Sequence, residues 1–195
     1  MTFDRFYEIA EENVITDLLD GKIFREPSAT PDHGFIIIWL RSALFTFVEK
    51  FDLGKVLGAT VAVRLTKYQG VEPDVFFISK PRLSIIGELY VDGPPDLCVE
   101  VLSESSRERD RGRKFVLYAE HGVREYWIID PLRNTVEFYE NHEGELMEIK
   151  PDARGRLRSK ILPGFWLKPE WLTSHPLPPV LKTLHAILGA EYCLT

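Results

Sequence analysis

Two acidic residues and one lysine are the side chains of this sequence best suited to metal-assisted hydrolysis. Asp74 follows Pro73 at the start of one apolar segment, and Glu100 interrupts an apolar run at 97–102. A carboxylate inside an apolar strand is unfavourable unless a cation, a partner or solvent compensates it. If the two segments are neighbouring strands, the carboxylates converge and suit Mg²⁺, an oxygen-preferring ion. Lys114 is then the candidate for stabilising negative charge or holding an attacking water.

The chain around Glu100 predicts a strand followed by a helix. Residues 96–103 are rich in β-branched and apolar side chains, and alternation places Glu100 on the same face as Cys98. A helix is expected at about 106–120. Lys114 can meet Glu100 only if this helix packs back across the sheet, as crossover helices do.

Local patterns define this helix further. Ser105 and Glu108 have the spacing of a capping box, which predicts the helix start. Gly122 is expected to follow its end. Because Lys114 and Tyr118 are four residues apart, they share one side of the helix.

The remaining elements follow from apolar periodicity and turn residues. They are a short helix at 3–13, a hairpin around 20–21, a loop at 28–33, a helix from about 34 to 51 ended at 54, strands at 55–67, 71–78 and 125–131, an antiparallel pair at 134–140 and 145–149, and a helix at 178–190. The core order αβββαβ predicts an α/β fold, with a mixed central sheet flanked by helices, extra β-hairpins and a C-terminal helix. The whole chain, 1–195, is expected to form a single domain.

Composition favours a cytoplasmic protein without a membrane partner. The longest apolar run, at 35–40, is far shorter than the roughly 18 residues of a membrane span, and no signal peptide is visible. Two cysteines are too few for a metal or disulfide framework. The net charge of −6 argues mildly against nucleic-acid binding, although basic residues cluster at 107–114 and 154–160. Solvated faces explain such clusters more often than phosphate binding does.

Several stretches of the chain carry a family resemblance. The sequence Glu72-Pro73-Asp74, the run at 93–103 and the blocks at 109–114 and 122–131 closely resemble the putative restriction endonuclease domain family. That family is a bacterial branch of the PD-(D/E)XK nuclease superfamily. The resemblance covers roughly residues 15–170 and implies a restriction-endonuclease-like fold.

The resemblance also implies a site and an activity. Asp74 and Glu100 match the family's two strand acids and are expected to bind Mg²⁺, with Mn²⁺ as a possible substitute. The superfamily's short signature would place a lysine at Leu102, but families of this branch resemble one another in carrying it on the following helix, which selects Lys114. The expected activity is metal-dependent hydrolysis of DNA phosphodiester bonds. Double-stranded DNA and a second copy of the chain, forming a homodimer, are the expected partners.

Three further positions are candidates for the same site. Asp17 aligns where the family usually has a glutamate before its Asp-Gly turn, and its side chain is shorter. Tyr118 lies on the helix of Lys114. His33 precedes a predicted helix, where a histidine is more often a cap or a surface residue than a base.

Simpler interpretations of these residues stay open at this point. Asp74 could close a turn, Glu100 could form a buried ion pair with an arginine such as Arg111, and Lys114 could be a solvated helix residue. The alternative function is a catalytically inactive nuclease fold that acts as a binding or assembly module, which the acidic balance and Leu102 favour. A metal-dependent hydrolase of smaller phosphate esters is a third possibility.

Overall fold

The computed structural model of the protein describes residues 1–10, 14–25 and 30–189. The helices and strands in these ranges are α1 (Phe3–Ile9), β1 (Thr16–Leu19), β2 (Lys22–Arg25), α2 (Pro31–Lys50), β3 (Gly54–Gly58), β4 (Val63–Thr66), β5 (Gln69–Val71), β6 (Val75–Ser79), the 3₁₀ helix η1 (Lys80–Ile85), β7 (Val91–Asp92), β8 (Leu97–Val101), α3 (Arg107–Arg111), α4 (Arg113–Glu120), β9 (Glu125–Asp130), β10 (Thr135–His142), β11 (Glu145–Ile149), β12 (Leu157–Arg158), β13 (Trp166–Leu167), α5 (Pro169–Thr173) and α6 (Val180–Leu188). Among them, no helix combines the length and apolar character that crossing a bilayer requires.

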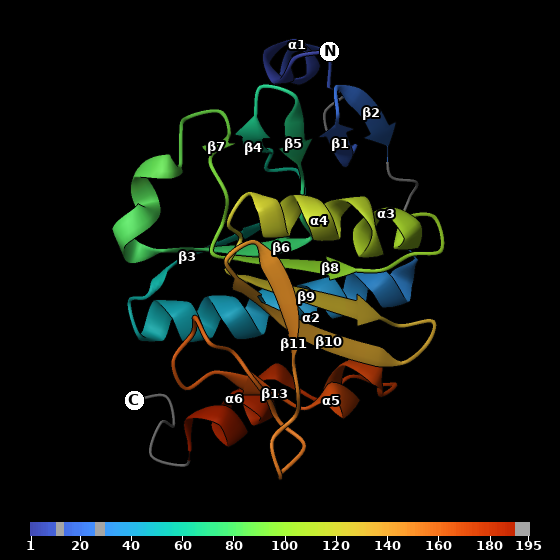
Figure 1. Cartoon of the computed structure of the whole chain (residues 1–195). Helices are drawn as coiled ribbons and strands as arrows, with labels where there is room; N and C mark the ends of the chain where they lie inside the picture. Colours follow the sequence, from blue (N-terminus) through green and yellow to red (C-terminus); the bar gives the residue numbers. More distant parts are fainter. Residues whose placement is uncertain (11–13, 26–29, 190–195) are drawn as a thin grey trace.

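A six-stranded mixed sheet forms the centre of the molecule (Figure 1). Its strand order is β11-β10-β9-β8-β6-β3, in which β8 and β9 run parallel and the other neighbours are antiparallel. The parallel pair is joined by α3 and α4, as a crossover connection requires. Strands β6, β8 and β9 are almost wholly buried because layers cover both of their faces.

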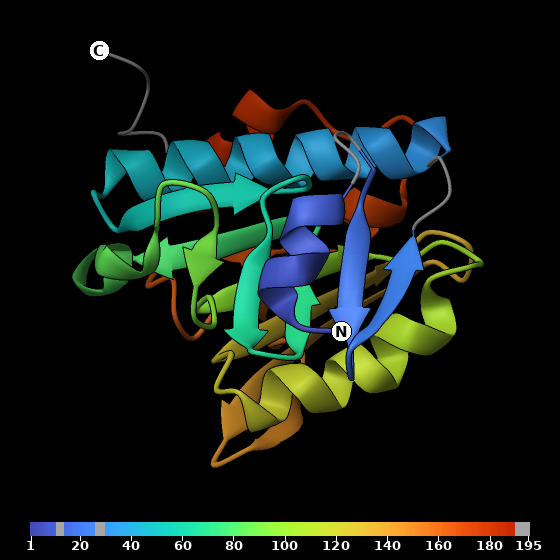
Figure 2. The same cartoon turned by 90° about the horizontal axis from the view of Figure 1, so that it is seen from above.

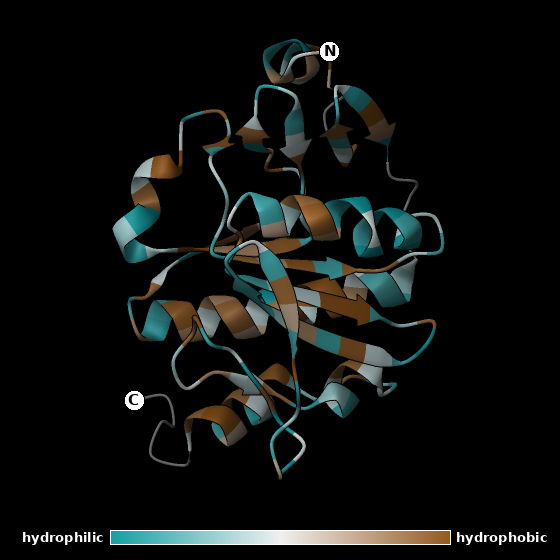
Figure 3. Ribbon diagram, in the orientation of Figure 1, coloured by the Kyte–Doolittle hydropathy of each residue, from teal (hydrophilic) through white to brown (hydrophobic). Residues whose placement is uncertain are grey.

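Side-chain alternation divides the core between the two faces of this sheet. Val99 and Trp127 pack with α2 and the C-terminal segment on one face. Cys98 and Ile128 pack with α4 and the smaller sheet on the other. Hydrophobic residues gather on the central strands and on α2, whereas α3 is almost entirely hydrophilic (Figure 3). Alternation along β8 therefore separates the two halves of the core, as its sequence predicts.

A smaller sheet lies over the α4 side of the molecule (Figure 2). Its strand order is β2-β1-β5-β4-β7, and α1 covers its outer side. Phe3 of α1 packs so closely over Gly70 of β5 that a Cβ atom there would lie 2.5 Å from the Phe3 ring. The small sheet is thereby held between α1 and α4.

The predicted αβββαβ core is confirmed as α2, β3, β6, β8, the α3–α4 pair and β9. The hairpin at 20–21 is also confirmed, since β1 and β2 pair antiparallel around it. So is the pair β10–β11, and the helix predicted at 178–190 is confirmed over Val180–Leu188. Parts of two other predictions, the helix at 3–13 and the loop at 28–33, lie outside the described residues.

The predicted strands at 55–67 and 71–78 are wrong as single elements. The first divides into β3 and β4, which belong to different sheets, because the chain turns at Thr60 with φ +75°. The second divides into β5 and β6 around Pro73, which has no N–H for a ladder. Alternating apolar residues continue through both breaks, so the pattern alone could not locate them.

The helix boundaries also differ from the predictions. Helix α2 begins three residues early, at Pro31, with Thr30 as N-cap, so His33 lies inside its first turn. Gly54 does not end this helix, which stops at Lys50, but begins β3. The helix predicted at 106–120 is broken at Gly112 into α3 and α4.

The predicted capping box is wrong. Ser106 is the N-cap of α3, and its side chain makes no capping bond to the helix. Instead, Ser103 and Ser106 exchange side-chain-to-backbone hydrogen bonds of 3.0 and 3.1 Å. These bonds close a turn before the helix, so the serines are used for the connection from β8.

Candidate active site

Strands β6 and β8 bring Asp74 and Glu100 to the same end of the central sheet. They pair antiparallel with Val75 opposite Val99, so the two acids occupy the next positions along this register. The Val101 backbone N–H donates to Asp74 Oδ2 over 2.7 Å. The condition on which the site prediction depends, that these strands are neighbours, is therefore met.

Lys114 lies within a ring of three carboxylates. Its Nζ atom is 3.0 Å from Glu100 Oε1, 3.0 Å from Asp17 Oδ2 and 3.3 Å from Asp110 Oδ1. Helix α4 packs back over β8, as the sequence required for this contact, and buries the lysine completely among these groups. An ammonium group out of contact with water requires such compensation.

Tyr118 holds the same carboxylate from the next turn of α4. Its hydroxyl donates to Glu100 Oε1 over 2.7 Å. One oxygen of Glu100 therefore accepts from both Lys114 and Tyr118, which fixes the orientation of the carboxylate. The four-residue spacing of the two donors produces this convergence.

His33 borders the site from the first turn of α2. Its Nε2 atom lies 2.7 Å from the Val101 carbonyl oxygen and 3.8 Å from Asp74 Oδ2. A carbonyl oxygen only accepts, so Nε2 carries the proton and donates it. His33 thus binds the carbonyl group of Val101, and Asp74 binds its N–H group. Val101 directly follows Glu100.

Asp17 and Glu72 join the small sheet to the site. The Glu72 N–H donates to Asp17 Oδ1, and the Thr16 N–H donates to Glu72 Oε2, each over 3.1 Å. The other oxygen of Asp17 faces Lys114 and also lies 3.3 Å from Arg109 Nε. Strand β1 therefore supplies an acid to a site whose other members come from the central sheet, the segment after β5 and the helices α2, α3 and α4.

Burial controls the ionisation of these groups. Asp74 is 6% and Glu100 3% exposed. Burial raises the pKa of Asp74 to about 6 and that of Glu72 to about 7. Burial also raises the pKa of Glu100 well above its usual range, despite the nearby Lys114. For Lys114, burial acts to lower the pKa, but the surrounding carboxylates outweigh it and hold the pKa well above its usual range.

The acid side chains outnumber the cations at this site. Five buried carboxylates face each other around Lys114 and Arg109; they are Asp17, Glu72, Asp74, Glu100 and Asp110. Burial is the main cause of the raised pKa values of Glu72, Asp74 and Glu100, and the neighbouring carboxylates raise them further.

A hard divalent cation fits this oxygen-rich, negatively charged environment. Within the described ranges, no three histidine, cysteine, aspartate or glutamate side chains converge as a complete metal-ligand set. Carboxylate oxygens such as those of Asp74 and Glu100 are the kind of ligand that Mg²⁺ prefers, with water completing its coordination.

The structure brings all six predicted site residues into one neighbourhood. They are Asp17, His33, Asp74, Glu100, Lys114 and Tyr118. The alternative pairing of Glu100 with Arg111 is wrong, because Arg111 binds Glu137 at 2.6 Å instead.

Sequence reasoning missed two members of the site, Glu72 and Asp110. Both had a detectable signal. Glu72 precedes Asp74 by two residues, and Asp110 precedes Lys114 by one helical turn, a spacing that brings an acid beside a base.

Comparison with known proteins places the chain beside a protein family, a relative in sequence and a solved structure. The family Uma2, described as "Putative restriction endonuclease", matches residues 3–170. The uncharacterized protein slr1290 of Synechocystis sp. is 25% identical over 149 residues, which are 75% of this chain and 77% of that protein. The crystal structure of a "putative nuclease belonging to DUF820" from Anabaena variabilis has a TM-score of 0.74 and 21% identity, covering 89% of this chain and 97% of that one. This last likeness concerns the fold.

Proposed function

This chain belongs to the Uma2 family, whose description is that of a putative restriction endonuclease, and from that premise we propose that it is a Mg²⁺-dependent endonuclease that hydrolyses DNA phosphodiester bonds. The observation that carries the proposal is the meeting of Asp74, Glu100 and Lys114 at one end of the central sheet. Double-stranded DNA is the proposed substrate because of the family. A homodimer is proposed because two related sites are the simplest way to cut both strands.

Asp74 and Glu100 would hold the metal in this proposal. Bound there, Mg²⁺ supplies a Lewis acid that polarises a phosphoryl oxygen and lowers the pKa of a bound water. The contribution of the protein is orientation and charge. Tyr118 and Lys114 fix the Glu100 carboxylate, and the Val101 N–H fixes that of Asp74.

Lys114 is the proposed electrostatic catalyst. Its ammonium group keeps its proton because three carboxylates surround it. A fixed positive charge in a site with little water stabilises developing negative charge on a phosphoryl oxygen more strongly than it would in water. Asp17 and Asp110 hold this ammonium group beside Glu100 and so act as positioning residues.

Cleavage of supercoiled plasmid DNA with Mg²⁺ or Mn²⁺ tests the proposal. Wild-type protein is expected to nick the plasmid, and Glu100→Gln is expected to abolish nicking while keeping the shape of the side chain. Glu140→Gln in β10 is the matched control and is expected to keep full activity, since Glu140 lies outside the site. Circular dichroism of each variant establishes that it is folded. Equal nicking by wild type and Glu100→Gln would refute the assignment.

The burial of the site favours one second function. Glu100, Lys114 and Asp17 are almost inaccessible and already paired with each other. Such a site also fits a nuclease fold that has become a binding or assembly module and keeps the polar cluster for structure. Calorimetric titration separates the two functions: Mg²⁺ or Mn²⁺ binding that Asp74→Asn removes supports the enzyme, and no binding to wild type supports the module.

A further inference from the structure

The cations beside the candidate site are already held by the protein's own acids. Each arginine of the stretch 107–113 has a carboxylate partner, and the pairs are Arg107–Asp130, Arg109–Asp17, Arg111–Glu137 and Arg113–Asp20. Lys114 is enclosed by three carboxylates. A phosphate could bind one of these groups only by displacing an acid. A polyanionic substrate therefore needs a cation from another element.

Arg41 of α2 is an exposed cation of a different kind. Within the part of the chain that the structure describes, no hydrogen bond or ion pair engages its guanidinium group. Arginine is always charged in proteins, and its planar group matches two oxygens of a phosphate. Arg41 is thus available to bind an anionic ligand without first losing a carboxylate partner.

Arg41 lies where the edge strand β3 reaches the end of the sheet that carries Asp74. A Cβ atom placed on Gly58, the last residue of β3, would lie 3.4 Å from Arg41 Nε and 2.4 Å from the Asp74 carbonyl oxygen. Gly58 pairs with Val75, the residue after Asp74, in the register of β3 and β6. Because Gly58 has no side chain, the guanidinium group lies close against the strand end beside Asp74.

Helix α2 follows the site end of the central sheet from β8 to β3. His33 contacts the Val101 carbonyl oxygen at the end of β8, and Arg41 lies at the end of β3. Eight residues separate them, which is about 12 Å along a helix. Strands β8, β6 and β3 are consecutive and about 4.8 Å apart, so two steps across the sheet span about 10 Å, in agreement with this. Arg41 therefore lies along the same edge as Glu100 and Asp74, beyond Asp74.

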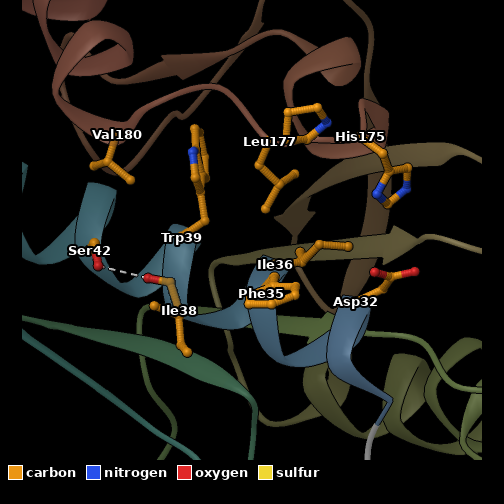
Figure 4. A pocket seen from close by; sticks show the side chains of 10 residues that line it. Asp32, Phe35, Ile36, Ile38, Trp39, Ser42, His175, Leu177 and Val180 are labelled. Atoms are coloured by element: carbon orange, nitrogen blue, oxygen red, sulfur yellow. Dashed lines mark hydrogen bonds between the residues drawn. The ribbon is translucent and has the colours of Figure 1, made fainter.

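Another flank of α2 is unsuited to phosphates and anchors the helix. It borders an apolar hollow of about 450 Å³ between α2 and the segment that leads into α6 (Figure 4). The residues that line this hollow include the acid Asp32 but no lysine or arginine. Trp39 Nε1 donates to the Pro178 carbonyl oxygen over 2.7 Å, which ties the helix to that segment. A rigid helix positions a binding side chain more precisely than a loop does, so α2 is a suitable support for Arg41.

We propose that Arg41 is a substrate-binding residue that holds a backbone phosphate of DNA beside Asp74 and Glu100. Since DNA is the substrate of the proposed function, this role of Arg41 rests on that proposal. The guanidinium group donates charge-assisted hydrogen bonds to the phosphate oxygens. Contacts to phosphates fix the position of a duplex on a protein but do not read its bases, so Arg41 contributes affinity and register rather than sequence preference.

Fluorescence anisotropy of a labelled DNA duplex with the full chain tests the proposal. Ca²⁺ replaces Mg²⁺ as the oxygen-preferring cation, and a denaturing gel establishes that the duplex stays intact. Arg41→Gln is expected to bind about 5–10-fold more weakly than wild type. Because one phosphate contact is lost, the slope of log K against log salt concentration is expected to fall in magnitude by about 1, measured between about 50 and 200 mM salt.

Two further variants separate the charge of Arg41 from a structural role. Arg41→Lys keeps the charge and is expected to keep the salt slope of wild type, with an affinity between those of wild type and Arg41→Gln. Arg154→Gln is the matched control. Arg154 is also an exposed arginine, but it lies in the loop after β11, at the edge of the sheet opposite β3, so binding is expected to stay within about twofold of wild type. Circular dichroism establishes that each variant is folded.

The possible results distinguish the role of Arg41 from the nuclease activity. Binding by Arg41→Gln with the affinity and salt slope of wild type would overturn the proposal for Arg41, whether or not wild type cleaves DNA. So would equal losses in Arg41→Gln and Arg154→Gln, or a wild type that does not bind the duplex. A wild type that binds the duplex but does not nick plasmid DNA would refute the nuclease activity alone, and a reduced salt slope in Arg41→Gln would still support the phosphate contact.

Discussion

Removal of the buried ammonium group by Lys114→Met is expected to destabilise the protein strongly. Methionine fills most of the same volume but leaves Asp17, Glu100 and Asp110 without the cation that lies 3.0 to 3.3 Å from each of them. Removing one partner of a buried ion pair typically lowers the free energy of unfolding by about 3–5 kcal/mol. For a domain of this size, that corresponds to a fall in Tm of roughly 6–20 °C.

The loss is expected to depend on pH. Burial already raises the pKa of Glu100, and removal of Lys114 raises it further. The folded variant therefore binds a proton at a pH at which the folded wild type does not. Each extra proton bound by the folded state recovers about 1.4 kcal/mol per pH unit as the pH falls. The deficit is therefore expected to become smaller as the pH falls, which measurements at pH 8 and pH 6 compare.

Urea denaturation followed by circular dichroism at both pH values measures these quantities. Lys182→Met on α6 is the matched control and, being an exposed helical lysine, is expected to change the free energy of unfolding by less than about 0.5 kcal/mol. Adding Glu100→Gln to Lys114→Met is expected to restore part of the loss, because one uncompensated charge is removed. A loss below about 1 kcal/mol at pH 8, or a deficit that grows on acidification, would refute the electrostatic account of this cluster.

Three other predictions concern stability. Burial raises the pKa of Glu72 to about 7, so its ionised form destabilises the folded protein only at higher pH. In urea denaturation, Glu72→Gln is therefore expected to raise the free energy of unfolding by about 3 kcal/mol at pH 9 and by less than about 1 kcal/mol at pH 5. Equal effects at both pH values would contradict this. Trp127→Ala should lower the free energy of unfolding by about 3–5 kcal/mol in the same assay, because it removes a ring whose centre lies 3.8 Å from that of Phe138. A loss under about 1 kcal/mol would count against tight packing there. Gly70→Ala forces the Phe3 ring to move and should cost about 1–3 kcal/mol by thermal denaturation, an expectation that an unchanged Tm would exclude.

Much of the central sheet could be predicted from short-range patterns. Alternation along β8 placed Glu100 and Cys98 on one face, and the structure buries Cys98 in the α4 half of the core, away from Val99. The spacing of Lys114 and Tyr118 likewise placed them on one side of a helix, from which both contact Glu100. Such periodicities are set by local backbone geometry, so a single sequence is enough to detect them.

Breaks in regular structure could not be predicted in the same way. Apolar alternation continues through Thr60, yet the chain turns there so that β3 and β4 can join different sheets. The contact between Asp17 and Lys114 joins residues 97 positions apart in the sequence and depends on how the small sheet lies against α4. Both features result from packing between elements, which local residue preferences do not encode.

The division of the acids between two sheets has a consequence for how the cluster around Lys114 would come apart. Asp17 arrives on β1, and the bonds from the Glu72 N–H to Asp17 and from the Thr16 N–H to Glu72 attach that strand to the segment before Asp74. Detachment of the small sheet would remove Asp17 from Lys114 while the central sheet stayed intact. Partial opening of this kind precedes global unfolding in many proteins. Mild denaturant should therefore separate Asp17 from Lys114 before secondary structure is lost, starting at the seam between the two sheets.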